Sequence, residues 1–209
     1  MATTISRLYD NYADAERAVG QLEQSGVPHS DISIVANNGE GWYGGGGKVD
    51  RDRDGVDDRA EGAGAGAGIG AALGGAAGLL AGLGLLAIPG LGPVVAAGWL
   101  VSTATVAAAG AATGGIIGAL TQSGVPEEEA SHYAEGVRRG GTLVCARVNE
   151  QDRRRVEAAL DRSSVDMTKR ATAWQQSGWK GFNPDAQPLS SDEIRRERQL
   201  YGEAAGMRR

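Results

Sequence analysis

Two short stretches of alternating apolar and polar residues flank a helical pattern at the start of this chain. Residues 3–8 and 31–36 alternate as strands do, and residues 11–24 place apolar side chains every three or four positions. The members of that helical face are Tyr12, Ala15, Val19 and Leu22. The pattern predicts a β-α-β unit.

The same order of elements returns in the second half of the chain. Pro126 and the three glutamates after it favour the start of a helix, because acidic side chains interact well with the helix dipole. The glycines at 140–141 end that helix. Residues 142–148 then read as a strand, 150–160 as a helix and 165–170 as a last strand. This predicts a second β-α-β unit.

The two units together predict an α+β fold, a ferredoxin-like β-α-β-β-α-β sandwich interrupted by an inserted Gly/Ala-rich helical hairpin. One unit alone has only two strands, which is marginal for independent stability. The expected segments are the first half of the α+β domain (1–38), an acidic and Gly-rich linker (39–61), the hairpin (62–122), the second half of the domain (123–171) and a C-terminal tail with a terminal helix (172–209).

The predicted insertion is a charge-free tract between Gly62 and Pro126. Prolines and glycines within 87–93 predict a turn, and therefore one helix near 62–87 and another near 93–122. Small residues four positions apart line one face of each predicted helix, which allows another backbone to approach closely. The helix-packing positions of this glycine zipper are Gly62, Gly66, Gly70, Gly74, Gly78, Gly82, Gly110, Gly114 and Gly118.

Neither predicted helix has a polar face, so its bulky face is expected to meet lipid or protein. A hairpin that enters and leaves a membrane on its cytoplasmic side fits the charged flanks. The alternative is a soluble hairpin buried in a homo-oligomer, with its bulky faces directed inward. The positive residues that flank the tract are Lys48, Arg51, Arg53, Arg59, Arg138 and Arg139.

An acidic loop directly before the tract has the spacing of an EF-hand calcium loop. Its expected oxygen ligands are Asp50, Asp52, Asp54, the carbonyl of Val56, Asp58 and Glu61. Gly55 falls where such a loop turns sharply. The alternative is a solvated linker whose interspersed arginines neutralise the acids. A possible Ca²⁺ site is therefore weighed against a plain linker.

Charge and side-chain chemistry limit the functional classes. A formal net charge of -5 disfavours a nucleic-acid partner, which normally meets a basic surface. Cys145 falls in an apolar strand, and His29 and His132 have no catalytic partner at useful spacing, so no catalytic residues are expected. The N-terminus lacks the pattern of a secretory signal. The expected location is the cytoplasm, with attachment to the cytoplasmic face of the inner membrane as an option.

Three segments together resemble the bacterial general stress (heat-induced, YflT-like) family. They are Ile32-Ser-Ile-Val, Ile88-Pro-Gly-Leu-Gly-Pro, and Gly124-Val-Pro-Glu-Glu-Glu-Ala-Ser-His-Tyr-Ala-Glu-Gly-Val-Arg-Arg-Gly-Gly. The likeness covers residues 3–171 and leaves the tail outside. It implies a cytoplasmic stress-response protein of unassigned biochemical activity, with no catalytic residues to carry over.

The expected function is that of a non-enzymatic stress-response protein. It would associate with membrane or self-assemble through the glycine-zipper hairpin, with calcium as a modulator. The alternative is a soluble regulatory module that binds a partner or small ligand on its ferredoxin-like sheet. In the tail, the aromatic residues Trp174, Trp179 and Phe182 are expected either to pack onto the sheet or to anchor a partner.

Overall fold

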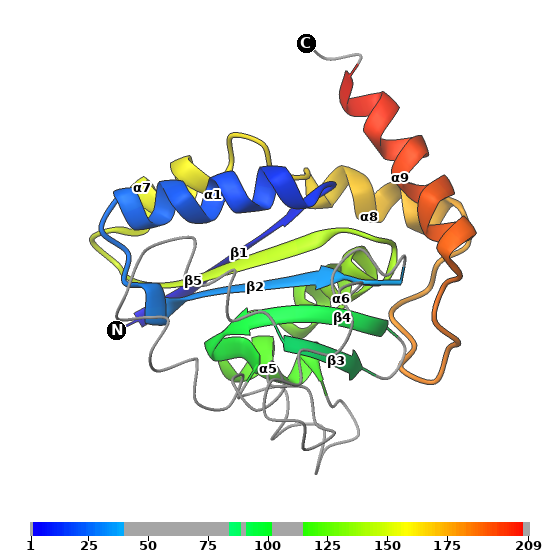
Figure 1. Ribbon diagram of the computed structural model, residues 1–209, viewed down its shortest axis with the longest axis horizontal. Helices are drawn as coiled ribbons and strands as arrows, with labels where there is room; N and C mark the ends of the chain where they lie inside the picture. The colour runs from blue at the N-terminus through cyan, green and yellow to red at the C-terminus, as the bar shows by residue number, and fades with distance from the viewer. Residues whose placement is uncertain (1, 40–83, 89–90, 102–114, 207–209) are drawn as a thin grey trace, which may run out of the picture.

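The computed structural model describes residues 2–39, 84–88, 91–101 and 115–206, which form an α+β structure (Figure 1). A five-stranded antiparallel sheet lies between two layers of helices. The elements in chain order are β1 (Ala2–Tyr9), α1 (Tyr12–Gln24), the short 3₁₀ helix η1 (His29–Asp31), β2 (Ile32–Asn37), β3 (Gly84–Ile88), β4 (Gly92–Gly98), α5 (Ile116–Gln122), α6 (Glu127–Arg138), β5 (Thr142–Asn149), α7 (Arg153–Leu160), α8 (Met167–Gln176) and α9 (Ser191–Gly206).

The strands lie in the order β1-β5-β2-β4-β3. β5 lies between the two N-terminal strands, since it pairs with β1 through Ile5 opposite Ala146 and with β2 through Ser33 opposite Cys145. β1 and β2 are therefore parallel to each other, with β5 between them. The hairpin β3–β4 extends the sheet from the far side of β2.

Each face of the sheet has its own apolar core. α1 and α7 cover one face, where Val19, Ile34, Val144 and Leu160 are fully buried. α5 and α6 cover the other face, where Leu120, Val94, Leu143 and Tyr133 are buried. Alternate residues of β5 enter opposite cores, as the pleat of a strand requires. This two-faced burial explains why β5 is apolar along most of its length.

The amphipathic elements of the sequence are confirmed, and local signals set their ends. α1 begins after Asn11, whose side chain accepts a hydrogen bond from the Asp14 amide as an N-cap. The first turn of α6 contains three glutamates after Pro126, as expected. α9 begins after Ser190, which exchanges hydrogen bonds with Glu193 in a capping box. The coarse prediction of an α+β fold is therefore confirmed.

The expected last strand at 165–170 is wrong. The Asp166 side chain accepts a hydrogen bond from the Lys169 amide and caps α8, which occupies most of that segment. Ala171 and Trp174 are buried at helical spacing on α8. Only the Val165 amide, which donates to the Leu8 carbonyl at 2.7 Å, lies where a strand beside β1 would begin. The N-cap outweighs the strand preference of Val165.

The helical hairpin is also wrong for the described part of the tract. Residues 84–88 and 92–98 form strands, where helices near 62–87 and 93–122 were expected. β4 is buried on both faces of the sheet, through Val94 on one and Ala97 on the other. Such a strand is apolar at every position and has no period that distinguishes it from a buried helix. Within the described part of the tract, the prediction of helix holds at residues 99–101 and in α5.

Candidate functional site

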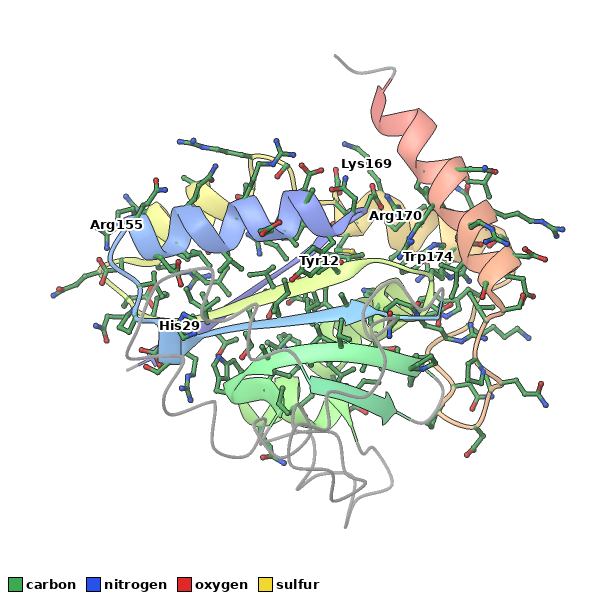
Figure 2. The ribbon with its side chains drawn as sticks, viewed as in Figure 1. Tyr12, His29, Arg155, Lys169, Arg170 and Trp174 are labelled. Atoms are coloured by element: carbon green, nitrogen blue, oxygen red, sulfur yellow. The ribbon has the colours of Figure 1, made fainter. Side chains whose placement is uncertain are left out.

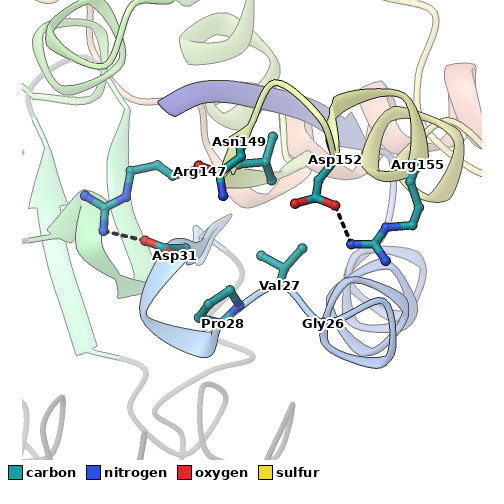
Figure 3. Close-up of a pocket in the computed structure, with 9 residues that line it drawn as sticks. Gly26, Val27, Pro28, Asp31, Arg147, Asn149, Asp152 and Arg155 are labelled. Atoms are coloured by element: carbon teal, nitrogen blue, oxygen red, sulfur yellow. Dashed lines mark hydrogen bonds and ion pairs between the residues drawn. The ribbon is translucent and has the colours of Figure 1, made fainter. Parts of the chain in front are cut away.

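An open groove of about 530 Å³ lies where α1 ends and α7 begins, beside the ends of β5 and η1 (Figure 3). Its walls combine the backbone of the turn after α1 with charged side chains from η1, from β5 and from the start of α7. The lining residues are Gly26, Val27, Pro28, Asp31, Arg147, Val148, Asn149, Asp152 and Arg155. Gly26 has a φ of +87°, so the tight turn that forms one wall favours glycine.

Arg147 is the most constrained charged group in this groove. Its Nη2 lies 3.1 Å from Asp31 Oδ1 and donates to the Ser30 carbonyl at 3.1 Å. Its guanidinium also lies over the ring of Trp99, 4.7 Å from the centroid. The Trp99 indole donates to the Asp31 carbonyl at 3.3 Å, which fixes the ring under the arginine. The Arg147 side chain is thus held in place on several sides while 40% of it is still exposed.

A second ion pair stands on the other side of the groove. Arg155 Nη2 lies 2.8 Å from Asp152 Oδ1, and both side chains are largely exposed, so this pair contributes little to stability. Figure 3 shows the two pairs facing each other across Val27 and Pro28. The charges of the lining residues cancel, and the lining contains no serine, cysteine, histidine or lysine. This arrangement can bind a small polar ligand.

The β3–β4 hairpin forms a second candidate surface, here called the hairpin edge (residues 84–88 and 92–98). β3 is the last strand of the sheet, and within the described residues no strand pairs with its outer side. Neither strand contains a charged residue. Edge strands of monomeric proteins usually contain lysine, proline or a bulge that prevents pairing with another chain. In the hairpin edge the single such residue is Pro93, which is on β4.

The residues expected to act as sites fall mostly outside the described part of the chain. This applies to the calcium ligands Asp50, Asp52, Asp54, Val56, Asp58 and Glu61, and to every glycine-zipper position except Gly118. Gly118 is buried within α5. Within the described residues there is no group of three or more His, Cys, Asp or Glu side chains that could hold a metal ion. Calcium binding stays a prediction, which calorimetry on the full chain and on Glu61→Gln would test.

Three residues with reactive side chains, His29, His132 and Cys145, occupy structural positions. His29 Nδ1 lies 2.9 Å from Glu23 Oε1 at the end of α1. His132 packs against Trp179, with 5.4 Å between the ring centroids. Cys145 is fully buried in β5, accepts a hydrogen bond from Ser6 Oγ at 3.2 Å, and burial raises the pKa of its thiol to about 12. None of these three is among the residues that line the groove.

Sequence reasoning missed the groove, although one signal was present. Arg147 is the only charged residue within the apolar run of β5, which marks it as a residue with a partner. Its partner Asp31 comes from η1, more than a hundred positions earlier in the chain. Only the pairing of β2 with β5 brings these two residues together.

Within the described residues, no helix is both long and apolar enough to cross a membrane. Searches against family models, curated proteins and solved structures found no match to this chain.

Proposed function

We propose that this chain is a non-enzymatic stress-response protein that self-associates, and that the hairpin edge is the surface through which two copies meet. The likeness of residues 32–35, 88–93 and 124–141 to the general stress family supports the stress-response setting. Self-association was expected from the uncharged tract. The structural reason differs, because residues 84–88 and 92–98 of the tract form strands rather than zipper helices.

The observation that carries this proposal is the uncharged outer strand of the sheet. β3 has the sequence Gly-Leu-Leu-Ala-Ile, and it pairs with β4 on one side. The amide and carbonyl groups on the other side of a terminal strand are a template for pairing with another strand. A second copy supplies an identical strand, and antiparallel pairing of two β3 strands about a two-fold axis gives a closed dimer.

We also infer a ferredoxin-like core for this module. β1, α1 and β2 form a split unit with β5 inserted between the strands, and α7 follows β5 as in that fold. The strand that would complete it beside β1 is reduced to the hydrogen bond from Val165 to Leu8. The hairpin edge lies at the opposite edge of the sheet from β1. Self-association through β3 therefore does not involve the β1 edge.

Sedimentation velocity of the full chain over about a hundredfold range of concentration tests the proposal, since assembly follows mass action. Ala87→Lys places a charge on β3. The residue paired with Ala87 on β4 is Pro93, and Pro93 is exposed, so we expect the charge to disturb the core little. We expect this variant to shift to monomer. The matched control Ala173→Lys, on the exposed side of α8, should sediment like the wild type.

Identical oligomer distributions for the wild type and Ala87→Lys would show that the hairpin edge is not the contact. A circular dichroism spectrum of each variant establishes that the fold is retained. Co-flotation of the wild type with anionic lipid vesicles distinguishes the membrane alternative. If flotation persists in Ala87→Lys while self-association is lost, membrane binding uses another part of the chain.

A second candidate function rests on the groove. Two arginine–aspartate pairs in a neutral, open cavity suit a small zwitterion, whose carboxylate would meet Arg155 and whose ammonium group would meet Asp152 or Asp31. Titration with glycine, followed by the amide NMR signals of Gly26 and Asn149, tests this. Arg155→Gln should abolish the shifts, and Arg154→Gln, which does not line the groove, should retain them. Absence of shifts in the wild type would eliminate this candidate.

A further inference from the structure

The C-terminal residues 177–206, here called the strap, pack against α6 and against the end of β2. Arg138 of α6 donates from Nη2 to the Gln187 carbonyl at 3.1 Å. Ser191 Oγ donates to the Gly39 carbonyl at 2.8 Å, and Ile194 is 99% buried beside it. A Cβ atom at Gly39 would lie 2.5 Å from Ile194 Cδ1, so the contact is close. The strap thus holds the chain at the point where it leaves β2.

A buried carboxylate organises the contact between the strap and α6. The Glu135 side chain is only 2% exposed, and its Oε1 lies 2.6 Å from Arg139 Nε and 3.3 Å from Arg138 Nη1. Arg139 Nη1 reaches across to Glu197 of α9 at 3.0 Å. Arg198 of α9 donates to the Gly140 carbonyl from Nε at 3.1 Å and from Nη2 at 3.0 Å. Three arginines therefore join the strap to the body of the protein.

The aromatic residues of the tail also meet at this contact. Trp174 of α8 lies under the Arg139 guanidinium, 5.1 Å from it, and Trp179 packs edge-on against Trp174. Figure 2 shows Trp174 and Arg170 on α8, close to where α9 begins to cross it. Trp179 packs against His132 of α6 and against Trp174, whereas Phe182 packs against the apolar core that α6 shares with the sheet.

Incomplete hydrogen bonding is concentrated at this contact. In the described part of the chain, five buried side-chain nitrogen or oxygen atoms have no hydrogen-bond partner. Four of the five belong to this region: Arg138 Nε, Trp174 Nε1, Trp179 Nε1 and Glu197 Oε2. A buried polar atom without a partner costs free energy relative to its hydrated state. Opening the strap would return these groups to water, so that cost favours the open form.

We propose that the strap is a displaceable clamp, which opens as a unit while the sheet remains folded, and which thereby releases Gly39. Local opening of this kind is expected where polar contacts outnumber apolar ones. Among the α9 side chains that the structure describes, the buried apolar one is Ile194. With the strap open, the face of α6 presents Arg138, Arg139 and their partner Glu135 to solvent.

The partner that fits the uncovered face is an amphipathic helix with the pattern of α9. The strap itself defines the chemistry, since an apolar residue enters beside Gly39 and a glutamate three positions later meets Arg139. Such a helix would compete with the strap for the same contacts. A segment without the glutamate would leave Arg139 with Glu135 alone.

Hydrogen exchange of the full chain, read by mass spectrometry, tests the clamp. In the wild type we expect amides of α9 to exchange at least about tenfold faster than those of β5, as sub-global opening requires. Arg198→Gln removes the contact with Gly140 and should accelerate exchange in both α9 and residues 37–39, with β5 unchanged. Arg196→Gln, exposed on the other side of the same helix, should leave all rates as in the wild type.

Two results would overturn the proposal. One is exchange of α9 at the rate of β5, which would make the strap part of the core. The other is acceleration of hydrogen exchange in α9 of Arg198→Gln without any change in residues 37–39, which would separate the strap from the end of β2.

Peptide binding tests the proposed partner. A labelled peptide with the sequence of residues 187–206 should bind the full chain, and it should bind the Arg198→Gln variant more tightly. Equal binding of the same peptide with Glu197→Gln would contradict the proposed pairing with Arg139.

Discussion

The hydroxyl oxygen of Tyr133 lies 2.6 Å from the carbonyl oxygen of Ser6, and this hydrogen bond joins α6 to β1. The same hydroxyl lies 2.9 Å from Glu129 Oε1, one turn earlier on α6. Burial, together with the Glu129 carboxylate, raises the pKa of Tyr133 well above its ordinary value. Helix and sheet are therefore joined by a polar contact within an otherwise apolar layer.

Replacement of Tyr133 by phenylalanine should destabilise the protein by about 1 kcal/mol, because the Ser6 carbonyl loses its donor while the ring still fills the core. Urea denaturation measures the change. Tyr201→Phe is the control, since it keeps the ring that lies under the Arg170 guanidinium at 3.8 Å. An equal decrease in unfolding free energy in both variants would show that the hydrogen bond from Tyr133 to Ser6 does not stabilise the protein specifically.

Gly98 ends β4 with a φ of +92°, and a Cβ there would lie 2.6 Å from Ser33 Oγ and 2.7 Å from Ser33 Cα. Gly124 has a similar φ of +90° but nothing within 4 Å. Gly124→Ala should therefore cost only the backbone term of about 1 kcal/mol. Gly98→Ala should cost clearly more, because β2 and β4 must also move apart. Thermal unfolding of the two variants gives the difference, and equal costs would contradict the close approach.

Cys145 should be inert in the folded protein. Burial raises the pKa of its thiol from 9.0 to about 12, so the reactive thiolate is scarce at neutral pH. Modification by iodoacetamide at neutral pH should follow unfolding, with the urea-unfolded chain as the reactive control. Rapid alkylation of the native protein would show that β5 opens readily.

The same thiol makes stability depend on alkaline pH. Between pH 9 and about 12 the folded protein keeps a proton that the unfolded chain releases. Stability should therefore fall as pH rises through that window. Cys145→Ala removes this contribution and should reduce the slope of unfolding free energy against pH. Urea titrations at several alkaline pH values compare the slopes, and unchanged slopes would exclude the thiol as a cause.

Arg170 joins α8 to the loop after β1, with Nη1 and Nη2 at 2.9 and 3.0 Å from the two carboxylate oxygens of Asp10. Lysine can keep the charge but not the paired geometry or the stacking on Tyr201. Arg170→Lys should cost roughly 1 kcal/mol in unfolding free energy. Lys169→Gln, on an exposed neighbour, should change it by less than about 0.5 kcal/mol. If the two variants change the unfolding free energy equally, the contribution of Arg170 comes from its charge alone.

The elements that could be predicted from the sequence are those with one solvent-exposed face. In α1 the residues Ala15, Val19 and Leu22 are buried at helical spacing, and the sequence pattern shows this directly. In β4 both faces are buried, so the pattern has no period and the hairpin was assigned to helices. At Asp166 a local cap decided between helix and strand, and alternation alone gave the wrong answer.

The candidate sites were less accessible to sequence reasoning, because they depend on strand order. The groove requires Asp31 beside Arg147, and the strap requires Glu197 beside Arg139. Each pair joins segments whose distance in the chain gives no hint of contact. The sheet order, with β5 between β1 and β2, could not be read from the local patterns that located the strands.

The central position of β5 has a consequence for synthesis on the ribosome. Among the strands that the structure describes, β1 pairs only with β5, whose first residue, Thr142, is made more than a hundred residues after Tyr9. At translation rates of about 5–20 residues per second, this leaves β1 without its partner for on the order of ten seconds. For that interval the N-terminal strand and the apolar face of α1 depend on chaperones or on transient contacts, so the nascent chain is most exposed to misassembly before β5 emerges.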